Sequence, residues 1–231
     1  MNKVRLVVFD IAGTTLQDSG NVAKAFSAAM KEHGYDIPEA EVNPLMGYTK
    51  PLALRMMLEK YEQNPALITE VLIHTIHDRF VELMIEYYKT GSGVVPLPGV
   101  DSVFSYLKER GVKIGLDTGF SKDIAQAIID RLGWEKEGKV NYVVASDEVP
   151  SGRPAPFMIR KMMDEAGIAD PLEVVKIGDT EVDINEGLNA GCLFSIGITT
   201  GAFTREELAK YNPSHIIDHI EELIPILESV N

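Results

Sequence analysis

Cysteine is nearly absent from this chain, and its scarcity removes several kinds of site. Cys192 is the only cysteine among 231 residues. An intrachain disulfide and a cysteine metal cluster are therefore excluded, and a reducing compartment is expected.

Positive charge is also scarce. Lysine and arginine number 22 against 35 acidic residues, which gives a formal net charge of -13. Such a balance argues against nucleic acid or an anionic membrane surface as the main partner. An anionic substrate would be repelled overall, so we expect local cations or a metal ion to hold it.

Long apolar runs are missing as well. No segment approaches membrane-spanning length, and the N-terminus lacks the basic region, apolar core and cleavage site of a signal peptide. We therefore expect no membrane association and a cytoplasmic location. With 45% hydrophobic residues, the chain can form one large domain or two smaller ones.

The first informative feature of the sequence is an apolar run that ends in a carboxylate. The residues from Val4 to Phe9 predict a buried parallel strand, and Asp10 follows at its carboxyl end. Ligands of open α/β sheets collect at that end. Gly13 permits an unusual backbone conformation, and Thr14 adds a hydroxyl and an amide that could bind an anion.

Two kinds of hydrophobic pattern follow along the chain. Residues 17–93 show only helical periodicity, whereas residues 94–231 alternate between helices and strands. We predict a Rossmann-like α/β core of residues 1–16 and 94–231, with a parallel sheet and helices on both faces. Residues 17–93 would form an inserted, all-helical cap domain over the end of the first strand. The later strands are predicted at 112–117, 140–145, 174–177, 193–198 and around 216.

Polar side chains gather at other predicted strand ends. Thr118 and Gly119 end one strand, and Ser121 could cap the next helix, whose amides would form an anion site. Asp179 ends another strand, and Asp183 follows four residues later. If the strands are neighbours, Asp10 and Asp179 converge, and their hard oxygens suit Mg²⁺.

Each motif also has a simpler interpretation. Asp10 could start a turn, and the Gly-Asp-Thr sequence around Asp179 could be a turn that caps a helix. Arg153, which precedes a proline, could be a phosphoryl ligand or a surface residue. Lys50 before Pro51 would by itself be read as a solvated lysine.

The order of these motifs resembles the haloacid dehalogenase superfamily over the whole chain. Most phosphatases of that superfamily carry an aspartate at the position of Ala12 and a lysine at the position of Arg153. The two departures are similar to the phosphonoacetaldehyde hydrolase (phosphonatase) family and its close relatives. Met46-Gly47-Tyr48-Thr49-Lys50 matches the segment that bears the Schiff-base lysine of that family.

The resemblance implies roles for particular residues. Asp10 would attack phosphorus, and Lys50 would form an imine with the carbonyl next to the carbon-phosphorus bond. Mg²⁺ would bind Asp10, the carbonyl of Ala12 and Asp179, with support from Asp183. Substrate or phosphate would be bound by Ala12, Gly13, Thr14, Met46, Gly47, Thr118, Gly119 and Arg153. Ala12 cannot protonate an alkoxide leaving group, which argues against a phosphomonoesterase.

Two positions depart from the phosphonatase pattern. Ala53 stands where that family has a histidine, and Phe120 stands where it has a tyrosine. The expected function is therefore a Mg²⁺-dependent, phosphonatase-like hydrolase of a 2-oxo-alkylphosphonate. The alternatives are a phosphatase or phosphomutase acting on a small phosphate monoester, and a non-catalytic binding protein on the same scaffold. The sequence leaves oligomeric state open, a homodimer being one option.

Overall fold

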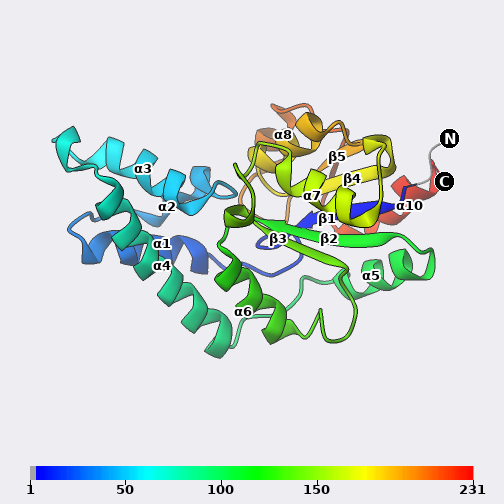
Figure 1. Cartoon of the computed structure of the whole chain (residues 1–231), viewed down its shortest axis with the longest axis horizontal. Coiled ribbons are helices and arrows are strands. Elements are labelled where there is room, and N and C mark those ends of the chain that lie inside the picture. Colours follow the sequence, from blue (N-terminus) through cyan, green and yellow to red (C-terminus); the bar gives the residue numbers. More distant parts are fainter. Residues whose placement is uncertain (1–3, 231) are drawn as a thin grey trace.

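The computed structural model describes residues 4–230, and six parallel strands form its single sheet (Figure 1). The order is β3-β2-β1-β4-β5-β6, so β1 lies between β2 and β4. This arrangement buries all five residues of β1, as its unbroken apolar run predicts. The strands are β1 (Leu6–Asp10), β2 (Lys113–Thr118), β3 (Tyr142–Ala145), β4 (Val174–Gly178), β5 (Phe194–Ile198) and β6 (His215–Ile217).

Helices cover both faces of this sheet, which confirms the predicted fold class. Val7 and Phe9 belong to one apolar cluster, together with residues of α5 (Val100–Glu109), α6 (Lys122–Leu132) and α10 (Leu223–Glu228). Leu6 and Val8 point to the opposite face, where they join α7 (Phe157–Ala166) and the end of α8 (Glu181–Ala190). The alternation of side chains along β1 thus feeds two separate apolar layers. A short helix that the sequence did not predict, α9 (Arg205–Ala209), follows β5.

The segment between β1 and α5 contains only helices and turns. Its elements are α1 (Asn21–Glu32), α2 (Glu39–Val42), α3 (Lys50–Tyr61) and α4 (Glu70–Thr90), with short 3-10 turns at Asn43–Leu45 and Pro65–Leu67. Figure 1 shows these helices beside the sheet, near the carboxyl end of β1. Phe26 and Phe80 meet at 6.1 Å between ring centroids inside the bundle. That this segment acts as a separate cap domain stays a prediction.

The two connections to the helical segment run side by side. The amide of Gln17 donates to the carbonyl of Val95 at 3.1 Å, and the amide of Leu97 donates to the carbonyl of Thr15 at 3.0 Å. The chain therefore leaves and re-enters the sheet domain through one paired junction, just beyond the end of β1.

Local details differ from the sequence expectations at several helix starts. The hydroxyl of Ser121 does not cap α6 and has no hydrogen-bond partner among the described residues. The carboxylate of Asp147 accepts from the amide of Lys122, the first residue of α6, at 2.9 Å. A 3-10 turn at Pro65–Leu67 precedes α4, which starts after Thr69, whose hydroxyl accepts from the amide of Leu72. Across residues 4–230, no helix combines the length and apolar character needed to cross a membrane.

Candidate active site

The carboxyl ends of β1, β2 and β4 meet at one cavity of about 200 Å³. Asp10 is the last residue of β1, Thr118 is the last of β2, and Asp179 directly follows β4. Their convergence follows from the strand order, because β1 pairs in parallel with both neighbours. Residues from both parts of the chain line the cavity, including Ala12, Gly13, Gly119, Met46, Gly47 and Lys50.

Lys50 is buried rather than solvated. Only 4% of the residue is exposed, and its ammonium donates to the carbonyl of Tyr48 at 3.3 Å. The nitrogen also lies 5.3 Å from the ring centroid of Phe120. Burial lowers the pKa of Lys50 to about 8, and the guanidinium of Arg153 acts in the same direction. A substantial neutral fraction of this amine is thus present near neutral pH.

The segment that carries Lys50 packs tightly against the sheet domain. A side chain at Gly119 would come within 2.6 Å of the carbonyl oxygens of Gly47 and Tyr48. The hydroxyl of Tyr48 donates to Glu181, at the start of α8, at 2.5 Å. Glycine at position 119 therefore permits the approach that brings Lys50 to the cavity.

Asp10 and Asp179 present carboxylates to this cavity at close quarters. Burial raises the pKa of Asp10 to about 6, although the nearby guanidinium of Arg153 opposes this shift. Burial and the charge of Asp10 raise the pKa of Asp179 well above its usual range. Repulsion between buried carboxylates favours a cation between them, and together with the carbonyl of Ala12 they form an oxygen donor set that fits a hard divalent ion.

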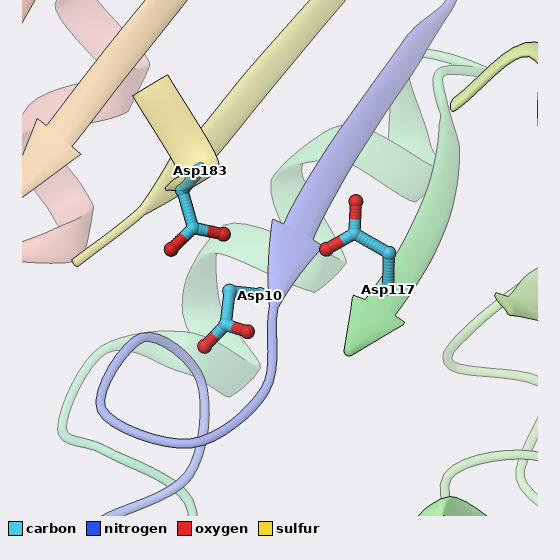
Figure 2. A group of neighbouring side chains, drawn as sticks. All are labelled: Asp10, Asp117 and Asp183. Atoms are coloured by element: carbon cyan, nitrogen blue, oxygen red, sulfur yellow. The ribbon is translucent and has the colours of Figure 1, made fainter. Parts of the chain in front are cut away.

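Arg153 lies behind Asp10 and outside the lining of the cavity. One guanidinium nitrogen is 2.7 Å from the carboxylate of Asp10 and 3.6 Å from that of Asp117, and the other contacts Asp183. Figure 2 shows these three aspartates converging from β1, β2 and the start of α8. Oxygens from the three carboxylates lie within 4.8 Å of one another, a spacing that could hold a metal ion. In this structure the guanidinium of Arg153 contacts all three carboxylates and balances part of their charge.

Two further predicted residues also lie just outside the cavity. The hydroxyl of Thr14 points to Asp179 at 3.5 Å, and Asp183 accepts from the amide of Thr180 at 3.2 Å. Both residues are fully buried. Their contacts hold Asp179 and the β4–α8 turn in place, so both residues can support the site without lining the cavity.

A buried charge cluster was missed by sequence reasoning. Lys176, in the middle of β4, has no exposed surface and contacts Asp117, Asp183 at 3.2 Å and Glu186 at 3.3 Å. Burial and the charge of Asp117 raise the pKa of Glu186 well above its usual range, while the ammonium of Lys176 opposes this shift. A lysine inside an apolar strand run was the signal that could have revealed this cluster, since a buried lysine requires partners.

Comparison with curated proteins identifies relatives that share nearly the full length. A phosphonoacetaldehyde hydrolase from Bacillus mycoides is 33% identical, covering 95% of this chain and 86% of that protein. One from Bordetella pertussis is 30% identical, covering 99% and 92% respectively.

Solved structures share the fold at lower identity. A hydrolase from Pseudomonas syringae superposes with a TM-score of 0.85 at 17% identity, with 99% of each chain covered. A predicted phosphoglycolate phosphatase from Haemophilus somnus gives 0.79 at 20% identity, covering 98% of this chain and 99% of the other. The shared fold therefore does not identify the substrate of this protein.

A family model also matches most of the chain. The haloacid dehalogenase-like hydrolase model covers residues 7–196, from β1 through β5. This span includes every residue that the sequence predicted for the site. Together with the relatives of similar length, it shows that the chain belongs to the haloacid dehalogenase-like hydrolase family.

Proposed function

We propose that this hydrolase cleaves the carbon-phosphorus bond of a 2-oxo-alkylphosphonate. The observation that carries the proposal is the placement of Lys50, a buried amine with a lowered pKa, in the same small cavity as Asp10. One group can attack a carbonyl carbon and the other can attack phosphorus. A phosphate monoester that lacks a carbonyl group would give the amine nothing to react with.

The lysine reacts first in this scheme. The neutral amine of Lys50 adds to the carbonyl carbon, and loss of water leaves an imine that binds a proton. The resulting cationic nitrogen is an electron sink for the adjacent carbon-phosphorus bond. The aromatic face of Phe120, close to Nζ, would stabilise this cation.

Asp10 then takes the phosphoryl group. A carboxylate oxygen of Asp10 bonds to phosphorus while the carbon-phosphorus electron pair moves toward the imine, forming an enamine on Lys50. Water hydrolyses the aspartyl phosphate to inorganic phosphate. Protonation of the enamine carbon and hydrolysis of the imine release the carbonyl product and restore the amine.

The residues around Asp10 suit a divalent cation, for which we propose Mg²⁺. Asp10, Asp179 and the carbonyl of Ala12 would hold it, with Asp183 supporting the site from behind. When bound, the ion would neutralise charge on the phosphoryl group and on the two carboxylates. Thr118 and Gly119, at the end of β2, would bind phosphoryl oxygens, and Arg153 would hold Asp10 in place from beneath.

Two further observations support carbon-phosphorus cleavage over ester hydrolysis. Ala12 offers no acid to protonate an alkoxide at the position next to the nucleophile. The curated relatives of similar length, at 30% to 33% identity, carry the name phosphonoacetaldehyde hydrolase.

Borohydride trapping tests the proposal directly. The protein would be mixed with 2-oxopropylphosphonate and sodium borohydride, and the adduct would be located by peptide mass spectrometry. We expect one stable adduct on Lys50 and phosphate release that depends on Mg²⁺, whereas Lys50→Arg should give neither. Lys60→Arg, at an exposed position of α3, is the matched control.

The alternatives predict different results in the same experiment. Absence of an adduct, combined with turnover of phosphate monoesters, would identify a phosphatase or phosphomutase. Absence of phosphate release from either class would identify a binding protein.

A further inference from the structure

One ionisable side chain at the cavity has no part in the chemistry described above. Among the described residues that line the cavity, Asp10, Asp18, Lys50 and Asp179 can ionise. Asp10 and Asp179 serve the phosphoryl and metal end, and Lys50 serves the carbonyl end. Asp18, which lies in the connection between β1 and α1, is left without a role.

The contacts of Asp18 leave one oxygen available. Its Oδ1 accepts from the amide of Asn21 at 2.8 Å, at the start of α1. Among the described residues, Asp18 and Lys50 form no ion pair, although both line the cavity and the charge of Asp18 acts on Lys50. The charge of Asp18 also acts on the phenols of Tyr87 and Tyr88 on α4. A carboxylate and an amine that share a cavity without touching leave room for a small molecule between them.

Imine formation needs proton transfers near Lys50, and of the three carboxylates whose charges act on this lysine, Asp10 and Asp179 already serve the phosphoryl and metal end. Met46 and Phe120 line the cavity close to this lysine, and neither can carry a proton. Ala53, one helical turn beyond Lys50 on α3, is buried and apolar. The hydroxyl of Thr118 is engaged by the amide of Phe120 at 3.2 Å, and it lies at the phosphoryl end.

We propose that Asp18 is the proton shuttle between the nitrogen of Lys50 and the carbonyl oxygen of the substrate, an inference that rests on the proposed function. The neutral amine adds to the carbonyl carbon, which leaves a proton to be moved from nitrogen to the alkoxide oxygen. Asp18 accepts that proton and delivers it, forming the neutral carbinolamine. It then carries the second N–H proton to the hydroxyl, which departs as water.

The protons balance over this sequence. Both amine protons end in the water molecule, Asp18 passes on each proton that it accepts, and the imine nitrogen takes one proton from solvent. The same transfers in reverse hydrolyse the imine after the carbon-phosphorus bond has broken. Asp18 is thus a catalytic residue for the carbonyl end of the substrate, separate from the groups that act on phosphorus.

The variant Asp18→Asn separates proton transfer by this side chain from its structural contact with the amide of Asn21. Asp18→Asn keeps a side-chain oxygen that can accept from the amide of Asn21, so the start of α1 is preserved. It removes the ability to accept and release a proton. Asp36→Asn, at an exposed carboxylate in the same helical segment, is the matched control.

The experiment measures the rate of the borohydride-trapped adduct on Lys50 with 2-oxopropylphosphonate. We expect Asp18→Asn to slow trapping about 100- to 1,000-fold, the usual loss for a general acid-base group, while Asp36→Asn matches the wild type. Binding of methylphosphonate, which has no carbonyl, should stay within about twofold. Added formate should partly restore the trapping rate of Asp18→Ala, which a purely structural role would not allow.

The outcomes separate the two proposals. Wild-type trapping with an equal rate in Asp18→Asn would overturn the shuttle and leave the proposed function standing. Loss of methylphosphonate binding in step with trapping, without rescue by formate, would assign Asp18 a structural role only. No adduct in the wild type would overturn both. Should Asp18→Asn fail to fold, Asp18→Ser keeps a capping oxygen and gives the same comparison.

Discussion

Lys50 shows at the scale of one residue how an environment creates reactivity. By sequence it is a lysine at the start of a helix, where a solvated side chain is the ordinary outcome. In the structure it is 4% exposed and close to an aromatic ring. Its pKa falls to about 8 because burial disfavours the charged form.

This shift predicts the pH dependence of imine formation. Because the pKa is lowered, the neutral amine is already populated near pH 8, and protonation removes it at lower pH. The trapping rate with 2-oxopropylphosphonate should rise almost tenfold per pH unit below about pH 7 and level off above about pH 8. Rapid-quench trapping between pH 6 and 9.5 measures this curve. A rise that continues toward pH 10.5 would contradict a desolvated amine.

Lys176 makes a prediction about stability. Its ammonium is fully buried among Asp117, Asp183 and Glu186, and Lys176→Met would leave buried carboxylates without their partner. We expect the free energy of unfolding to fall by about 3–5 kcal/mol, measured by urea denaturation. Lys161→Met, which removes an exposed pair with Glu165, should cost less than about 0.5 kcal/mol. A similar small loss for both variants would show that the buried cluster is not stabilised by the lysine.

At the scale of elements, loops at the strand ends place the segment 46–50 over the cavity. Gly119 follows β2 and contacts this segment through its backbone, and Tyr48 binds Glu181 at the start of α8. These contacts involve elements that are far apart in the sequence. The position of the amine is therefore a product of the β2 and β4 loops as much as of α3.

Gly119→Ala tests this placement. The added methyl group would lie 2.6 Å from two carbonyl oxygens, so the segment carrying Lys50 must shift. We expect kcat/KM for phosphate release to fall on the order of 10- to 100-fold, because small displacements of reacting groups are costly. Gly93→Ala, where the methyl group would meet only the hydroxyl of Tyr87 at 3.5 Å, is the control. Unchanged activity in Gly119→Ala would show that the segment tolerates the shift.

At the scale of the whole molecule, the helical segment lies beside the sheet and is joined to it through a paired junction. Gln17 and Leu97 link the two connections by backbone hydrogen bonds. The ring centroids of Phe80, on α4, and Phe120, next to β2, lie 6.4 Å apart. The apolar cluster is therefore continuous between the helices and the sheet. Residues of both the helices and the sheet domain line the cavity, and closure of the helical segment over it stays a prediction.

Tyr48→Phe tests how much one contact contributes to closure. The hydroxyl of Tyr48 donates to Glu181, and burial together with this carboxylate raises the pKa of Tyr48 to about 12. A hydrogen bond to a charged group contributes about 1.5–3 kcal/mol, so we expect faster hydrogen exchange in residues 43–50 and a severalfold rise in KM. Tyr106→Phe, which removes a 3.3 Å contact with Glu228, should change neither quantity. Unaltered exchange in Tyr48→Phe would mean that other contacts hold the segment.

The sequence was a good guide to the elements and to the position of Asp10 at the end of β1. The apolar run before Asp10 specified a buried strand, and the alternation after residue 94 specified a parallel sheet, which the structure confirms. These features depend on local hydrophobic periodicity, which can be read from the order of the residues alone. Helix starts were less well predicted, as α6 shows: Asp147, distant in the sequence, accepts from its first amide, and Ser121 makes no capping hydrogen bond.

The sequence alone thus determined the strands, the helices and the carboxylates at the strand ends, because each depends on nearby residues. Tertiary structure alone decided that Lys50 is buried, that Arg153 lies behind Asp10, and that Lys176 pairs with Asp117. The physical reason is that burial and charge pairing depend on which distant segments exclude water from a side chain. A pKa is set by that exclusion, so the reactivity of a residue is fixed only when the fold brings its neighbours together.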